Sequence, residues 1–138
     1  MNLKNKNIGF ALTGAFYTFN KVIPKIKELV KKQANIIPIM SYNAYNIDTK
    51  IGKALDFVEK IEKITGNKII HTIEEAEKLG VNKVTDIIVI APATGNTIAK
   101  LANGISDTPV LTAVMSNIRN NNPVVVAISS NNALSREC

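Results

Sequence analysis

The sequence predicts an α/β protein, a three-layer, Rossmann-like or flavodoxin-like, doubly wound parallel sheet. Short runs of β-branched apolar residues alternate with segments whose apolar residues recur at helical spacing. The run at 87–91 is apolar throughout, as expected of a strand buried on both faces of a parallel sheet. This alternation of strands and helices points to parallel strands joined by crossovers. We expect the 138 residues to form one domain over 1–138.

The chain is expected to begin with two strands and the helix between them. Residues 7–12 form the first strand, and apolar residues at helical spacing predict a helix from 19 to about 33. Pro24 either marks the start of the helix proper or bends it. Residues 36–40 form the second strand, in which Pro38 indicates irregular or edge-like pairing.

A polar loop at 41–46 and two further helices lead to the central strand. The second helix is expected at 51–65, where a glycine follows and stops it. The third begins at Thr72, which forms a capping box with Glu75, and ends at 79–80.

The segment 86–113 organises the chain. Its strand at 87–91 is followed by Pro92, which is expected to forbid ladder pairing and to turn the chain. A short polar stretch at 93–97 then leads into a short helix at 98–103. The sequence therefore predicts a helix N-terminus at the carboxyl edge of a buried strand, where open α/β sheets bind ligands.

The C-terminal part is expected to add two strands. Residues 110–112 read as a fourth strand, 114–119 as one or two helical turns, and 123–129 as a fifth strand. Residues 130–138 supply neither a last helix nor a sixth strand. We therefore expect a shortened C-terminal part, or an oligomer that covers the sheet beside the fifth strand.

Composition favours a cytoplasmic protein. No apolar run reaches the roughly 18 residues that a membrane helix needs, and the chain runs directly into its first strand, so no signal peptide is expected. The only cysteine, Cys138, cannot form an internal disulfide. The net charge is +6, but the lysines are interspersed with glutamates, which favours a solvated surface over a nucleic-acid footprint.

Three polar loops are expected to meet at the carboxyl edge of the sheet. Residues 13–15 leave the first strand; they lack the Lys and Ser or Thr of a P-loop, and they read either as a phosphate-binding loop or as an ordinary tight turn. Ser41 follows the second strand, and 94–97 follows the central one. Together they favour a flat, anionic ligand such as a nucleotide or a flavin.

Other types of site are disfavoured. His71 is the only histidine, and its place before a helix cap favours a surface residue over a general base. No metal site is expected, because the chain has no second histidine, no cysteine cluster and no carboxylate pair at ligand spacing. The chain also lacks a G-x-S-x-G elbow, which argues against a hydrolase.

The motif at 91–97, with the helix at 98–104, resembles the signature of the homo-oligomeric flavin-containing cysteine decarboxylase superfamily. Residues 13–15 are similar to the first FMN-phosphate loop of that superfamily, and Ser41 stands where it places a Ser or Thr. The resemblance implies an FMN-binding protein that forms trimers or multiples of trimers. It implies these cofactor-binding residues: Thr13, Gly14, Ala15, Ser41, Pro92, Thr94, Gly95, Asn96 and Thr97.

Within the superfamily, the segments 9–14, 57–66, 89–96 and 118–125 resemble an oxidoreductase branch. Members of that branch act with an NADPH-binding A subunit and oxidise dihydrodipicolinate, a small dicarboxylate, to dipicolinate during sporulation. The resemblance implies the same activity here, with the chemistry carried by the flavin. It does not identify a catalytic residue.

Two departures count against decarboxylation. The decarboxylases carry a catalytic His shortly before the central strand, where this chain has Ala76 and Glu77. They also carry a P-x-M-N-x-x-M-W clamp after the fourth strand, which 112–119 does not match. An FMN-dependent decarboxylase of the phosphopantothenoylcysteine type remains an alternative, as does a non-catalytic flavin-binding assembly subunit.

Overall fold

Four parallel strands form the sheet within the described residues, which are 2–14, 19–48 and 52–128 of the computed structural model. They are β1 (Asn7–Leu12), β2 (Asn35–Met40), β3 (Ile87–Ala93) and β4 (Val124–Ile128). Their order across the sheet is β2-β1-β3-β4, and each neighbouring pair is parallel. The chain thus adds a strand on one side of β1 and then continues on the other, as in flavodoxin-like folds. The predicted fold class is confirmed.

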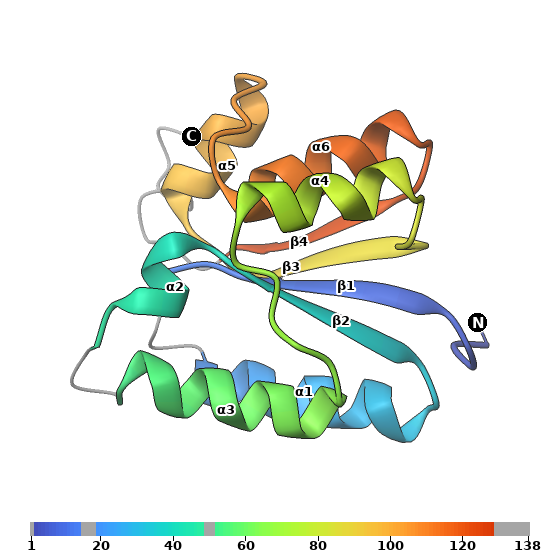
Figure 1. Cartoon of the computed structure of the whole chain (residues 1–138), viewed down its shortest axis with the longest axis vertical. Coiled ribbons are helices and arrows are strands. Elements are labelled where there is room, and N and C mark those ends of the chain that lie inside the picture. Colours follow the sequence, from blue (N-terminus) through green and yellow to red (C-terminus); the bar gives the residue numbers. More distant parts are fainter. Residues whose placement is uncertain (1, 15–18, 49–51, 129–138) are drawn as a thin grey trace.

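Helices enclose the sheet on both faces (Figure 1). They are α1 (Phe19–Lys31), α2 (Tyr42–Asn46), α3 (Ala54–Thr65), α4 (Ile73–Val81), α5 (Gly95–Ala102) and α6 (Pro109–Arg119). α1 and α3 cover one face, and α4 and α6 cover the other. Successive residues of β1 therefore enter two different cores: Phe10 and Leu12 pack with α1 and α3, whereas Ala11 packs with α4 and α6. Burial on both faces explains why these strands are apolar throughout.

Hydroxyl side chains start four of the helices. Ser41, Thr72, Thr94 and Thr108 are the N-caps of α2, α4, α5 and α6, and each side-chain oxygen accepts a hydrogen bond from a backbone N–H in the first turn. At Thr72 the predicted capping box with Glu75 is confirmed. Three of these caps, all except Thr72, also lie at the cavity described below.

The predicted strand at 110–112 was wrong, because these residues belong to α6. Thr108 caps the helix, and Pro109 occupies its first position, where the missing N–H has no intrahelical partner to lose. Val110, Leu111 and Thr112 are buried within the helix, and Val110 packs with residues of α4 and the sheet rather than pairing in a ladder. The fourth strand is therefore β4, and the chain that follows it starts at 129, outside the described residues. The segment 112–119, compared above with the clamp of the decarboxylases, thus precedes the fourth strand.

Two further boundaries differ from the prediction. Residues 42–46, predicted as loop, form the single-turn helix α2 because Ser41 supplies its cap. β3 does not stop before Pro92; it continues to Ala93, which pairs with Ile128 after a shift of register. This irregularity accommodates a proline that cannot donate to the ladder. α5 consequently begins at Gly95, three residues earlier than expected.

Gly80 does not end its helix but lies inside α4. A Cβ atom at this position would overlap the side chain of Ser116 in α6. The glycine is therefore required by the close approach of α4 and α6, the pair that covers one face of β1 and β3.

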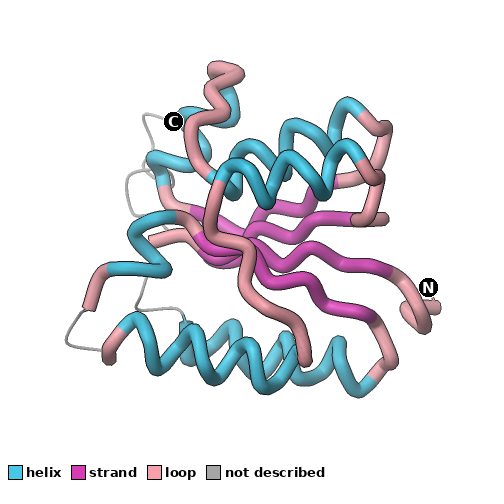
Figure 2. The backbone as a smooth tube through the Cα atoms, in the orientation of Figure 1, coloured by secondary structure: helices cyan, strands magenta, loops and turns pink. Residues whose placement is uncertain are grey.

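The two outer edges of the sheet differ. Along β2, the segment between α3 and α4 runs beside the strand (Figure 2), where Met40 donates to the Ile70 carbonyl and Ile70 donates to the Pro38 carbonyl, each at 2.9 Å. Pro38 thus lies in a strand that ends the sheet, as predicted. β4 is exposed, since the solvent-exposed fractions of Val125, Val126 and Ile128 are 47, 38 and 46%.

Candidate ligand site at the carboxyl edge

The loops that follow β1, β2 and β3 surround a cavity of about 320 Å³. Its lining residues are Thr13, Gly14, Ser41, Tyr42, Asn43, Thr94, Asn96, Thr97, Lys100, Thr108 and Leu111. The three polar loops predicted from the sequence therefore do converge. The volume lies at the lower end of the range of small-molecule sites.

Thr13 ties the loop after β1 to the loop after β3. Its side chain is buried, its hydroxyl donates to the Pro92 carbonyl at 2.7 Å, and the same oxygen accepts from the Thr94 N–H at 3.0 Å. The Thr13 N–H also donates to the Pro92 carbonyl at 3.2 Å. We call this set of bonds the Thr13 clip. Because its hydroxyl is used in both directions, Thr13 contributes to the cavity mainly by fixing the positions of its neighbours.

Ser41 also makes two hydrogen bonds that position walls of the cavity. Its backbone N–H donates to the Leu12 carbonyl at 3.0 Å, and its hydroxyl accepts from the Ala44 N–H at 3.2 Å. The first bond ties the end of β2 to the end of β1, and the second holds α2 over the cavity.

The first turn of α5 forms a third wall. Thr94 and Thr97 join through their hydroxyl oxygens at 2.9 Å, and the Thr97 N–H donates to the Thr94 hydroxyl at 3.2 Å. Asn96 is exposed and lines the cavity. Because helix N-termini carry partial positive charge, the starts of α5 and α6 at this cavity favour an anion there.

Lys100 is a lining residue to which the sequence analysis gave no role. It lies four residues after Asn96 on α5, and its ammonium contacts both carboxylate oxygens of Asp107, at 3.0 and 3.1 Å. The spacing from Asn96 was a usable signal, since residues four apart share a face of a helix. Of the described lining residues, Lys100 is the only charged one.

Two of the other predicted positions, Pro92 and Gly95, are not among the lining residues of the cavity. Pro92 is buried beneath it and supplies the carbonyl of the Thr13 clip. Gly95 is the first residue of α5. Ala15 lies outside the described residues.

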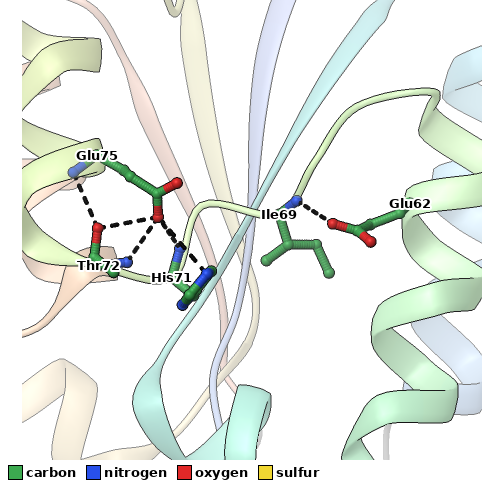
Figure 3. A network of polar contacts seen from close by, with 5 residues as sticks. All are labelled: Glu62, Ile69, His71, Thr72 and Glu75. Atoms are coloured by element: carbon green, nitrogen blue, oxygen red, sulfur yellow. Dashed lines mark hydrogen bonds and ion pairs between the residues drawn. The ribbon is translucent and has the colours of Figure 1, made fainter.

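His71 lies directly before the cap of α4, as predicted, but it also follows Ile70, which pairs with β2. Its ring stacks on Tyr45 of α2, with centroids 4.0 Å apart and planes 4° apart. Its Nε2 lies 3.9 Å from a carboxylate oxygen of Glu75 (Figure 3). His71 thus reaches the carboxyl edge of the sheet, beside α2, although it is not a lining residue.

Hydrogen bonds set the charge state of Glu75. Partial burial raises the pKa of this carboxyl, but the His71 N–H, the Thr72 hydroxyl, the charge of His71 and the Thr72 N–H outweigh that effect. The pKa of Glu75 is therefore below its usual value. These hydrogen bonds favour the charged form of the carboxyl, and the one from the Thr72 N–H belongs to the capping box.

A second cavity, of about 360 Å³, lies between α1 and the sheet face of β3 and β4, and apolar residues such as Phe10, Val22, Leu29 and Val89 contribute to its walls. It contains none of the polar loop residues. We assign the ligand site to the carboxyl edge, since the groups able to orient a polar ligand meet there.

The fold is that of an α/β protein with a polar cavity at the carboxyl edge of its sheet, and the comparisons give its family. The chain belongs to the Flavoprotein family, which matches residues 1–136. It is similar to the B subunit of dipicolinate synthase from Bacillus subtilis, with 47% identity over 96% of this chain and 66% of that protein. The chain thus spans just under two thirds of this relative. The resemblance to the oxidoreductase branch is confirmed.

Solved structures agree on the fold. The crystal structure of the dipicolinate synthase B subunit from Bacillus halodurans superposes with a TM-score of 0.86 at 39% identity, over 99% of this chain and 70% of that one. The FMN-dependent cysteine decarboxylase SpaF shares the fold, with a TM-score of 0.75 at 24% identity over 95% of this chain and 72% of that one. No helix among the described residues is long and apolar enough to cross a membrane.

Proposed function

We propose that this chain binds FMN in the carboxyl-edge cavity and acts as the B subunit of a dipicolinate synthase. The observation that carries the proposal is the convergence of three polar loops and one lysine on a single cavity. The described lining contains no carboxylate, and two helix N-termini face it, so a phosphate-bearing group fits the charge of these walls. Membership of the Flavoprotein family supports the choice of a flavin.

Different residues would contact different parts of the cofactor. Gly14 and Ser41 would hold the phosphate, with Thr13 holding the Gly14 loop in place and Ala15 continuing that loop. Thr94, Gly95 and Thr97 would contact the phosphate or the ribityl chain from the start of α5. Asn96 would face the flavin ring and the substrate carboxylate.

When bound, the flavin would supply the redox chemistry, and the protein would supply position and electrostatics. The reaction would be the oxidation of dihydrodipicolinate to dipicolinate, carried out with the NADPH-binding A subunit of the synthase during sporulation in the cytoplasm. The name of the Bacillus subtilis relative supports this substrate and a partner subunit. A homo-oligomer fits the exposed apolar residues of β4.

The test is a flavin spectrum followed by an activity assay. Purified chain incubated with FMN and then desalted is expected to retain flavin absorbance, and Gly14→Asp is expected to lose it, because a carboxylate would enter the phosphate end of the cavity. The control is Asn82→Asp, which adds the same charge at an exposed position after α4, away from the cavity. A wild-type chain that retains no flavin would contradict the proposal.

Activity separates the remaining alternatives. Oxidation of dihydrodipicolinate by the A subunit should increase when the flavin-loaded chain is added. If flavin stays bound but the rate depends only on the A subunit, the chain is an assembly subunit. If carbon dioxide is released from a cysteinyl substrate, it is a decarboxylase.

A further inference from the structure

We propose that Lys100 binds the anionic group of the ligand and that Asp107 holds this lysine in place until the ligand arrives. The identity of the ligand in this inference rests on the proposed function. The negative charge of the ligand follows from the cavity alone. The anionic group is an oxyanion, either the phosphate of the flavin or a carboxylate of the substrate.

Geometry places Lys100 between the cavity and its partner. It lines the cavity together with Asn96 and Thr97 of the same helix, whereas Asp107 lies outside the lining, directly before the cap of α6. The side chain of Lys100 is 27% exposed and that of Asp107 56% exposed. Lys100 thus forms part of the wall of the cavity, while its ammonium is paired with an exposed carboxylate outside the lining.

Energetics make the exchange of partners feasible. An ion pair with one exposed member contributes only about 0–1 kcal/mol, because solvent screens it and side-chain entropy opposes it. An oxyanion inside the cavity would meet the same ammonium in a less screened position, where charge-assisted hydrogen bonds are stronger. Lysine has a flexible stem and three donors, so it can turn toward the cavity while it keeps a contact with Asp107.

The cavity offers no competing charge. None of its described lining residues is acidic, and Lys100 is the only charged one among them. Neutral donors and helix N-termini would accept many polar ligands, but a lysine selects for those with negative charge. Lys100 is therefore a residue that determines specificity.

The experiment compares FMN with riboflavin, which has the same ring and ribityl chain but no phosphate. Dissociation constants are measured by flavin fluorescence quenching for the wild type and for Lys100→Met, Lys100→Arg and Asp107→Asn. If Lys100 binds the phosphate, Lys100→Met weakens the binding of FMN about tenfold and leaves the binding of riboflavin unchanged. Lys100→Arg restores most of the lost FMN affinity. Asp107→Asn binds FMN at least as tightly as the wild type. Urea unfolding of each variant excludes a loss of fold.

A second arm uses dipicolinate itself, titrated by calorimetry into the chain with and without flavin. If Lys100 binds a carboxylate, Lys100→Met weakens the binding of dipicolinate about tenfold. The ratio of FMN affinity to riboflavin affinity is then the same in this variant as in the wild type. If Lys100→Met changes neither the ratio nor the dipicolinate affinity, the inference is wrong. A wild type that binds dipicolinate through Lys100 but no flavin would overturn the proposed cofactor and leave this inference standing; a wild type that binds neither overturns both.

Discussion

Thr13 shows how one side chain can hold two walls of a site together. The residues that its hydroxyl joins stand 79 and 81 positions further along the chain. Its donor and acceptor functions are both used inside the protein, so the clip is complete without a ligand. The site is therefore preorganised at this point, which reduces the ordering that a ligand must impose on binding.

Replacing Thr13 by Val should remove the two hydroxyl bonds of the clip while keeping the shape of the side chain. The partly buried Thr94 N–H would lose its acceptor, and leaving a group of this kind unpaired costs up to about 1–3 kcal/mol. We expect a loss of this size in the free energy of urea unfolding, together with weaker FMN binding. Thr13→Ser keeps the hydroxyl and should behave like the wild type; equal losses in both variants would contradict the role of the hydroxyl.

At the scale of elements, the capping box at the start of α4 makes the stability of the fold depend on pH. The pKa of Glu75 is lower in the folded chain than its ordinary value of 4.5. A carboxyl with a lowered folded pKa stabilises the fold fully above its unfolded pKa, and the contribution is lost as the pH falls through the folded value. The capping box is therefore an acid-sensitive feature of this helix.

Glu75→Gln tests this linkage. The difference in unfolding free energy between wild type and variant should be present well above pH 4.5 and should shrink as the pH falls through and below this value, because protonation of Glu75 removes the same charge as the substitution. Chemical unfolding across the acid range measures the difference. Glu74→Gln, in the same helical turn but outside the capping box, should show a smaller dependence on pH; an identical profile for both variants would count against the assignment.

Elements also show what the sequence could and could not predict. All four observed strands were predicted to within two residues at each end, because β-branched apolar runs bounded by polar residues are a local signal. The second half of α6, 114–119, was predicted as helical, but its beginning was not. Residues 110–112 look like a strand in isolation, and their helical state depends on the Thr108 cap and on packing against α4. The loops of the site were predicted from their place after the strands. The Thr13 clip and the Lys100–Asp107 pair were not, since each depends on tertiary geometry.

At the scale of the whole molecule, the sheet is closed along β2 and exposed along β4. Native proteins usually protect an edge strand with charged residues, proline or a covering segment, and residues of β4 exposed to solvent are apolar instead. An exposed strand of this kind favours association with another chain or segment. This asymmetry supports the proposed homo-oligomer and suggests where it is joined.

Val126→Lys should therefore reduce self-association, because a charged side chain on an edge strand opposes pairing. Sedimentation velocity over a range of protein concentrations measures the effect. Val81→Lys is the matched control, since Val81 is 81% exposed and lies at the end of α4, away from β4. A wild type that sediments as a monomer at every concentration would remove the homo-oligomer from the proposal.

The Thr13 clip also has a kinetic consequence. Because it holds the loops after β1 and β3 together, these two walls cannot separate to admit a ligand without breaking its three hydrogen bonds. The clip includes no residue of the other described walls, α2 and the start of α6. Ligand exchange should accordingly proceed past α2 or α6, and the residence time of a bound ligand should depend on the opening rate of those helices.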